Sequence, residues 1–195
     1  MNKLLLITFA VAAAVPSQAV LFDWENTATG DQTSVSQTVG GLTATASAPP
    51  GLLTVLDFSS QAGYGAFGTR CLVGKFANPN RDPVRVAFSS VVGSVSVDYG
   101  DNNGDNDGTI FFEAFNSSDV MVGSSSFLLG TDPTPHSISV SGLNISYVVG
   151  RSTGTQFPNS IVWDNYSTTA VPEPATLLAM LVGTGALMLR RRSRS

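Results

Sequence analysis

The residues best suited to chemistry in this sequence lie in one acidic segment, from Asp98 to Gly108. It holds four carboxylates and three amides within eleven residues, and calcium takes six to eight such oxygen ligands in flexible geometry. The residues predicted to hold calcium are Asp101, Asn103, Asp105 and Asp107. The same residue types also form solvated turns, so a hairpin loop without an ion is the alternative.

A second group of candidates lies near residue 165, where two aromatic residues flank an acid and an amide. An aromatic ring can pack under a sugar, and neighbouring carboxylates or amides can hydrogen-bond its hydroxyls. The predicted ligand-binding residues are Trp163, Asp164, Asn165 and Tyr166. Large aromatic side chains are usually buried, so packing in the core is the alternative for both rings.

Residues suited to hydrolysis are few. His136 is the only histidine, and no Gly-x-Ser-x-Gly nucleophile motif accompanies it. A glycosidase needs two carboxyl groups across the bond that it cleaves, and Glu25 and Glu113 are the only glutamates before the C-terminal tail. No catalytic residue is assigned. We expect a non-enzymatic protein, with a secreted polysaccharide hydrolase as the alternative.

Charge and cysteine content restrict the partners. Between Val20 and Val171 there are five basic and thirteen acidic residues, a net charge of −8. Proteins that bind nucleic acid present basic surfaces, so nucleic acid is not an expected partner. Cys71 is the only cysteine, which excludes an intramolecular disulfide and a thiolate metal cluster.

The elements that must position these candidates are predicted to be strands. Polar and apolar residues alternate with period two, most clearly in His136-Ser-Ile-Ser-Val-Ser141, and no helical period extends over ten residues. Other strand-like runs lie at 42–46, 94–99, 110–115, 145–149 and 161–163. Turn-forming clusters such as Asn116-Ser-Ser-Asp119 separate them. The pattern predicts an all-β fold, a jelly-roll-like β-sandwich, over residues 20–168.

The N-terminus has the plan of a secretory signal. Lys3 precedes an apolar stretch from Leu4 to Val15, which is followed by Pro16 and a small residue, Ala19. This arrangement is typical of a signal peptide. We therefore predict a signal peptide at residues 1–19, cleaved after Ala19, and an exported body.

The C-terminus contains three segments in a fixed order. Val171-Pro172-Glu173-Pro174 precedes an uncharged apolar segment, Ala175 to Leu189, and the chain ends in Arg190-Arg191-Arg192-Ser193-Arg194-Ser195. A helix over 175–189 would be about 23 Å long, and a hydrocarbon core is about 30 Å thick. Such a helix spans the bilayer with local thinning and snorkelling arginines. The basic end then stays cytoplasmic and the body lies outside.

These three segments resemble the tails of PEP-CTERM proteins, which carry a Val-Pro-Glu-Pro-like motif, a hydrophobic helix and an arginine-rich end. The resemblance covers residues 171–195. It implies recognition by an exosortase through Pro172, Glu173 and Pro174, while the helix holds the protein in the inner membrane. The resemblance also implies that the processed protein is located in the cell envelope or extracellular matrix, where it associates with exopolysaccharide or biofilm.

A looser similarity concerns the second half of the body. Residues 91–166 look like the jelly-roll carbohydrate-binding-like domains found in PEP-CTERM proteins. The similarity rests on Val97-Asp-Tyr-Gly-Asp101, the strand Thr109 to Phe115, Phe115-Asn-Ser-Ser-Asp119 and Ile161-Val-Trp-Asp-Asn165. It implies a polysaccharide-associated or structural module.

Overall fold

The computed structural model describes residues 19–58, 68–77, 80–101, 106–132, 134–154 and 158–170. The predicted signal peptide, apart from Ala19, and the predicted sorting tail at 171–195 lie outside these residues. In the described ranges we find no helix with the length and apolar character needed to cross a membrane.

The described chain is all-β, as the alternating pattern predicted. Its strands are β1 (Val20–Phe22), β2 (Gly30–Gln32), β3 (Ser34–Val39), β4 (Leu42–Ser47), β5 (Leu53–Asp57), β6 (Arg70–Gly74), β7 (Phe76–Ala77), β8 (Asn80–Arg81), β9 (Val84–Asp101), β10 (Thr109–Phe115), β11 (Met121–Leu128), β12 (His136–Ser152) and β13 (Ile161–Ala170). All the strand pairs are antiparallel.

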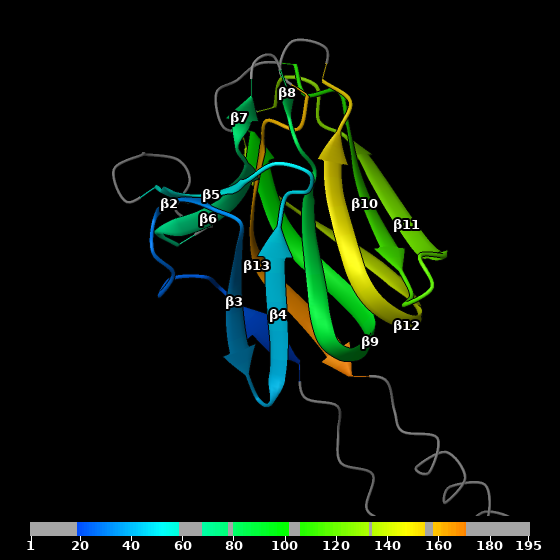
Figure 1. The fold of residues 1–195 in the computed structure, drawn as a ribbon. Coiled ribbons are helices and arrows are strands. Elements are labelled where there is room, and N and C mark those ends of the chain that lie inside the picture. Colours follow the sequence, from blue (N-terminus) through cyan, green and yellow to red (C-terminus); the bar gives the residue numbers. More distant parts are fainter. Residues whose placement is uncertain are drawn as a thin grey trace, which may run out of the picture. The chain divides into compact units, whose positions relative to one another are not determined.

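Eleven of these strands form one sheet, and β7 and β8 pair separately. The main path runs β11-β10-β12-β9-β13-β6-β5-β2, with β1 attached to β13 and the β3–β4 hairpin attached to β9. Figure 1 shows that this sheet curves over on itself, so that its two halves face each other. The arrangement is consistent with the predicted β-sandwich.

Two long strands, β9 and β12, belong to both halves. The first part of β12 pairs with the end of β9, whereas its last part lies between β10 and the beginning of β9. The register shifts between Ser141 and Tyr147, where Asn144 has a φ of 59°. Such an irregularity bends a strand. The sequence predicted two strands, 136–141 and 145–149, and the structure joins them into one bent strand.

The core lies between the two halves and is dominated by aromatic side chains. The largest fully buried residues include Trp24, Trp163, Tyr99, Tyr166, Phe22 and Phe112. Gly150 of β12 allows the halves to approach, because a Cβ there would lie 2.6 Å from Cζ2 of the Trp163 ring on β13. Among the described residues, the buried core residues run from Phe22 to Tyr166, and Gln18–Ala170 form a compact unit of their own.

Candidate functional site

The outer face of β9, β12 and β10 carries aromatic and arginine side chains. In β10 the buried residues alternate with half-buried ones, which places Phe111, Glu113 and Phe115 on the outer face. The register sets Phe111 opposite Arg151 and Phe115 opposite Tyr147. We name this surface the outer platform; it consists of Arg85, Phe111, Glu113, Phe115, Tyr147 and Arg151.

The rings and guanidinium groups of the outer platform stack on one another. The Phe115 and Tyr147 rings are nearly parallel, with centroids 4.9 Å apart and an interplanar angle of 9°. The guanidinium carbon of Arg85 lies 4.0 Å from the centre of the Tyr147 ring, and that of Arg151 lies 4.2 Å from the Phe111 ring. Both distances fall within the range of cation–π attraction.

Hydrogen bonds hold these groups in place. Arg151 donates from Nε to Glu113 Oε2 at 3.1 Å and from Nη2 to Oε1 at 2.7 Å, a bidentate pair that raises the pKa of Arg151. The Tyr147 hydroxyl donates to Asp119 Oδ1 at 2.9 Å. Burial, followed by this hydrogen bond, raises the pKa of Tyr147. No described carboxylate forms an ion pair with Arg85.

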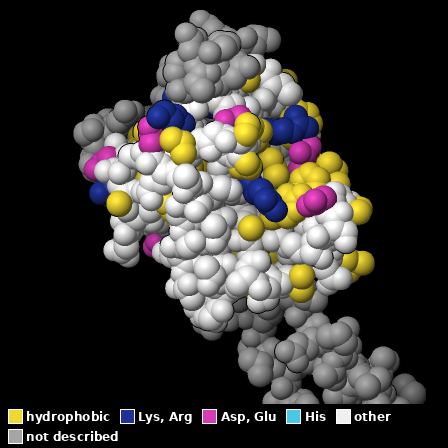
Figure 2. Space-filling view, viewed as in Figure 1, with side chains coloured by type: hydrophobic (Ala, Val, Ile, Leu, Met, Phe, Trp, Pro, Cys, Tyr) yellow, Lys and Arg dark blue, Asp and Glu magenta, His cyan; other side chains and the backbone are white. Residues whose placement is uncertain are grey.

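The outer platform has the chemistry needed to hold a sugar chain. The C–H face of a sugar packs against an aromatic ring, while its hydroxyls accept from guanidinium groups and donate to carboxylates. Figure 2 shows hydrophobic atoms exposed beside basic and acidic side chains on the side of the molecule where β10 and β11 lie. Apolar and polar groups therefore share one accessible surface.

Sequence reasoning missed the outer platform because 110–115 looked continuously apolar. The signal was Glu113 within that run, since a charged residue on a strand points to the solvent and period two then places Phe111 and Phe115 beside it. The partners on β9 and β12 required the pairing register, which the sequence did not supply.

The sequence-predicted stacking residues lie in the core. Trp163 is 1% exposed and Tyr166 is 0% exposed. The Trp163 ring centre lies 6.1 Å from that of Phe112 and 5.7 Å from that of Tyr99. Neither ring presents a face to a sugar in this structure, which corrects the stacking expectation in favour of core packing. Asn165 is half-buried, and its Nδ2 donates to Asp98 Oδ2 at 3.0 Å.

Asp164 is fully buried, and neither of its carboxylate oxygens has a hydrogen-bond partner of normal geometry in the described chain. Burial raises the pKa of Asp164 from its ordinary value of 3.8 to about 9. A weak contact with the Asn165 backbone N–H opposes this rise, whereas the carboxylates of Glu25, Asp23 and Asp98 add to it. Asp164 is therefore a neutral acid at pH 7 rather than a charged sugar ligand.

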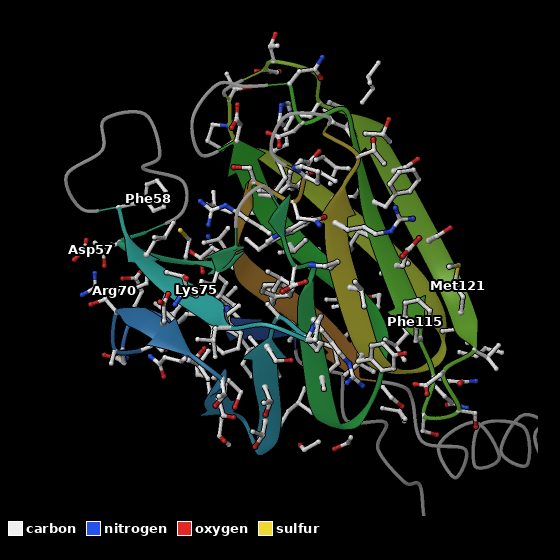
Figure 3. The ribbon with its side chains drawn as sticks, turned by 45° about the horizontal axis from the view of Figure 1, so that its top comes forward. Asp57, Phe58, Arg70, Lys75, Phe115 and Met121 are labelled. Carbon is white, nitrogen blue, oxygen red and sulfur yellow. The ribbon has the colours of Figure 1, made fainter. Side chains whose placement is uncertain are left out.

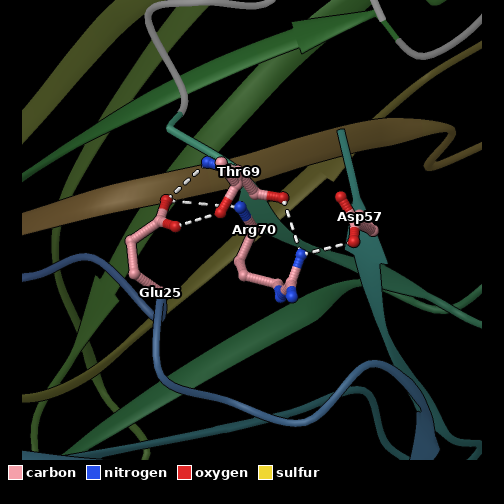
Figure 4. Close-up of polar contacts among 4 residues, drawn as sticks. All are labelled: Glu25, Asp57, Thr69 and Arg70. Atoms are coloured by element: carbon pink, nitrogen blue, oxygen red, sulfur yellow. Dashed lines mark hydrogen bonds and ion pairs between the residues drawn. The ribbon is translucent and has the colours of Figure 1, made fainter. Parts of the chain in front are cut away.

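Glu25, one of these carboxylates, anchors the segment after β1 to the beginning of β6 (Figure 4). Its Oε1 accepts from the Thr69 N–H at 2.6 Å and the Arg70 N–H at 3.2 Å, and its Oε2 accepts from the Thr69 hydroxyl. Arg70 forms an ion pair with Asp57 at 2.7 Å. These contacts give Glu25 a structural role.

The acidic loop is described only at its ends. Asp101 and Asp107 are both buried, and the other two predicted ligands, Asn103 and Asp105, lie outside the described residues. Within the described ranges, no group of three His, Cys, Asp or Glu side chains is placed to hold a metal ion. Calcium at this loop stays a prediction.

His136 lies at the beginning of β12 beside aromatic rings. Its ring centre lies 4.7 Å from that of Phe127 and 5.8 Å from that of Tyr99. Its Nε2 lies 3.1 Å from Asp132 Oδ2 and 3.3 Å from Thr134 Oγ1. Glu113 is bound to Arg151 and Glu25 to Thr69, so the three residues considered for hydrolysis all have structural contacts.

Comparison with known proteins identifies no family. No family model matches the chain, and no curated protein matches it. Among solved structures, the K1 cleaved adhesin domain of Lys-gingipain from Porphyromonas gingivalis is 10% identical with a TM-score of 0.43, over 79% of this chain and 99% of that domain. A mutant of a family 29 carbohydrate-binding module is 12% identical with a TM-score of 0.34, over 78% and 92%.

The arabinose-bound α-L-arabinofuranosidase MgGH51 is also similar, with 11% identity and a TM-score of 0.46. The match covers 81% of this chain but only 27% of that enzyme. With TM-scores below 0.5, these similarities carry no functional inference, and the site is interpreted from its own side chains.

Proposed function

We propose that this chain is an exported, non-catalytic module that associates with extracellular polysaccharide through the outer platform. The observation that carries the proposal is the stack of Arg85, Tyr147 and Phe115 on the solvent side of the sheet. A protein that only needed to fold would gain more from burying these rings than from leaving them half-exposed.

The geometry of the outer platform suits a chain of sugars better than a single sugar. Phe111 and Phe115 lie four residues apart on one strand face, which corresponds to roughly 13 Å. Arg151 lies over the Phe111 ring, and Arg85 lies over the Tyr147 ring on which Phe115 stacks. Each of these two groups therefore has a guanidinium that can hydrogen-bond a sugar hydroxyl. Two such units along one surface would hold successive parts of an extended polysaccharide.

The test is binding of the body, residues 20–170, to a panel of immobilised envelope and matrix polysaccharides. We expect Tyr147→Ala to weaken the binding by at least about tenfold, because it removes the ring on which Arg85 and Phe115 stack. Tyr147→Phe keeps the ring and should bind almost as the unmodified body does. Leu143→Ala, at an exposed position outside the outer platform, is the control.

Two outcomes would contradict the proposal: no polysaccharide on the panel binds, or Tyr147→Ala binds as well as the control. Circular dichroism of each variant shows whether a loss of binding comes from the changed surface or from unfolding of the body.

Delivery of the body is the second part of the proposal. We propose that an exosortase recognises Val171, Pro172, Glu173 and Pro174 and that Arg190, Arg191 and Arg192 keep the end of the tail cytoplasmic. In a host that contains an exosortase, Pro172→Ala with Pro174→Ala should leave the protein in the inner membrane at its unprocessed mass. The matched change Ser193→Ala should be processed normally. Equal processing of both variants would refute recognition through the two prolines.

A further inference from the structure

Strand β11 forms one end of the main sheet. It pairs with β10 only, and no strand of the described chain pairs with its other side. Its eight residues, Met121 to Leu128, contain no charged residue and no proline. An uncharged strand edge of this length offers its backbone N–H and C=O groups to another strand.

The other sheet ends are protected in ways that β11 is not. β2 has three residues and includes Asp31, which forms an ion pair with Lys75 at 2.6 Å. β3 is covered at Gln37, whose Oε1 accepts from the Trp24 N–H at 3.3 Å and whose Nε2 donates to Asp23 at 2.9 Å. Short length, charge and coverage are the usual protections of an edge. β12 approaches β11 closely at Gly123, where a Cβ would clash with the Ser141 carbonyl oxygen. From Ser124 to Leu128, β11 shows none of these protections in the described chain.

Exposed apolar side chains gather along β11. Val120, Met121, Phe127 and Leu128 have exposed fractions of 56%, 49%, 40% and 74%. Figure 3 shows Met121 beside Phe115, with which it is in register at one end of β10. Apolar side chains beside an open strand edge are the combination found at strand-pairing interfaces.

We propose that β11 pairs with β11 of a second copy of this chain, antiparallel and about a two-fold axis. A second copy fits because the strand is self-complementary: Ser124, Ser125 and Ser126 lie between apolar residues at both ends. Antiparallel pairing about this centre sets serine opposite serine. It also brings the exposed apolar ends of the two strands together. The absence of charge leaves nothing on the strand to select a partner of opposite charge.

Self-pairing through β11 is independent of polysaccharide binding. It would extend each sheet edge to edge and leave the outer platforms of both copies open. A two-fold contact also uses the same edge of both copies, so the assembly closes as a dimer instead of growing into a fibre.

The test is the mass of the body, residues 20–170, by sedimentation over a range of concentrations. We expect a dimer whose dissociation constant rises at least about tenfold in Ser124→Lys with Ser126→Lys, because charge on an edge opposes strand pairing. Ser139→Lys, on an exposed serine of β12, carries a charge change of the same sign and should leave the dimer unchanged. A monomer at every concentration overturns the proposal, and so does a dimer that the lysines do not weaken.

Cross-linking locates the contact. Cys71 is fully buried, and burial raises the pKa of its thiol far above the ordinary value, so an introduced surface cysteine reacts alone. Ser125→Cys at the centre of β11 should give a disulfide-linked dimer on mild oxidation, whereas Ser139→Cys should not. If Ser139→Cys forms the cross-link and Ser125→Cys does not, the contact lies elsewhere and pairing through β11 is refuted.

Discussion

Replacing Trp163 by alanine should lower the free energy of unfolding by about 3–5 kcal/mol, because it leaves a large cavity between the halves of the sheet. Trp163 is 1% exposed and packs against Phe112, Tyr99 and the backbone of Gly150. Urea unfolding of the body measures the change. The change tests directly whether the ring belongs to the core or to a binding surface.

The matched comparison is Tyr147→Ala, which removes a ring from the solvent side of the sheet. Its loss should cost only about 1 kcal/mol, the order expected for its stacking contacts. The two variants should therefore separate, with Trp163→Ala losing stability and Tyr147→Ala losing polysaccharide binding. A Trp163→Ala body that kept its stability and lost only binding would restore the expectation that Trp163 contacts a sugar.

Replacing Asp164 by asparagine should make the body more stable at pH 8 and leave its stability near pH 4 almost unchanged. The folded protein keeps the Asp164 proton up to a pKa of about 9, whereas an ordinary aspartate releases it near 3.8. Between these values the folded state binds the extra proton. Stability from this group is therefore complete below about pH 4 and is lost as the pH rises towards 9.

Between these pH values Asp164 contributes a decline of about 1.4 kcal/mol per pH unit. Asp164→Asn removes this decline because an amide does not ionise. Urea unfolding in chelator, from pH 5 to pH 9, measures the slopes, and chelator ensures that no bound cation holds the carboxylate charged. Asp82→Asn is the control, because Asp82 Oδ2 accepts from the Gly51 backbone N–H at 3.1 Å and Asp82 is not among the carboxylates that raise the pKa of Asp164. Equal slopes for Asp164→Asn and the unmodified body would disprove a neutral Asp164.

Polysaccharide binding by the outer platform and pairing through β11 are compatible, and neither proposal depends on the other. A dimer formed through β11 would carry two outer platforms, and a polysaccharide that reached both would bind with higher avidity. Ser124→Lys with Ser126→Lys should then lower the retention on a long polysaccharide more than the retention on a short fragment. Tyr147→Ala should lower both.

The sequence by itself determined the all-β class, several turns and the strand runs that lie within β4, β9, β10, β12 and β13. It did not identify β1 to β3, β5 to β8 or β11. Period-two alternation is a local property, and it identified His136–Ser141 as a strand because one face must be apolar. Ile110–Phe115 was identified as a strand from its short apolar run between turns. The predicted turn at Asn116–Asp119 is present, since Asn116 Oδ1 accepts from the Ser118 and Val120 backbone N–H groups. The tail pattern at 171–195 is likewise readable from residue order alone, and its function stays a proposal.

Only the tertiary structure decided which aromatic residues face the core and which face the solvent. Trp163 and Tyr147 look alike as large rings on alternating strands, yet one lies between the halves of the sheet and the other beside Arg85 on the outer platform. Alternation gives two faces to each strand but does not say which face is inside when both carry aromatic residues. That choice depends on the register of strands far apart in the chain, such as Glu113 with Val149 and Val149 with Arg85. Long-range pairing also left β11 at the end of the sheet, because a free edge is a property of the assembled strands and not of any one segment.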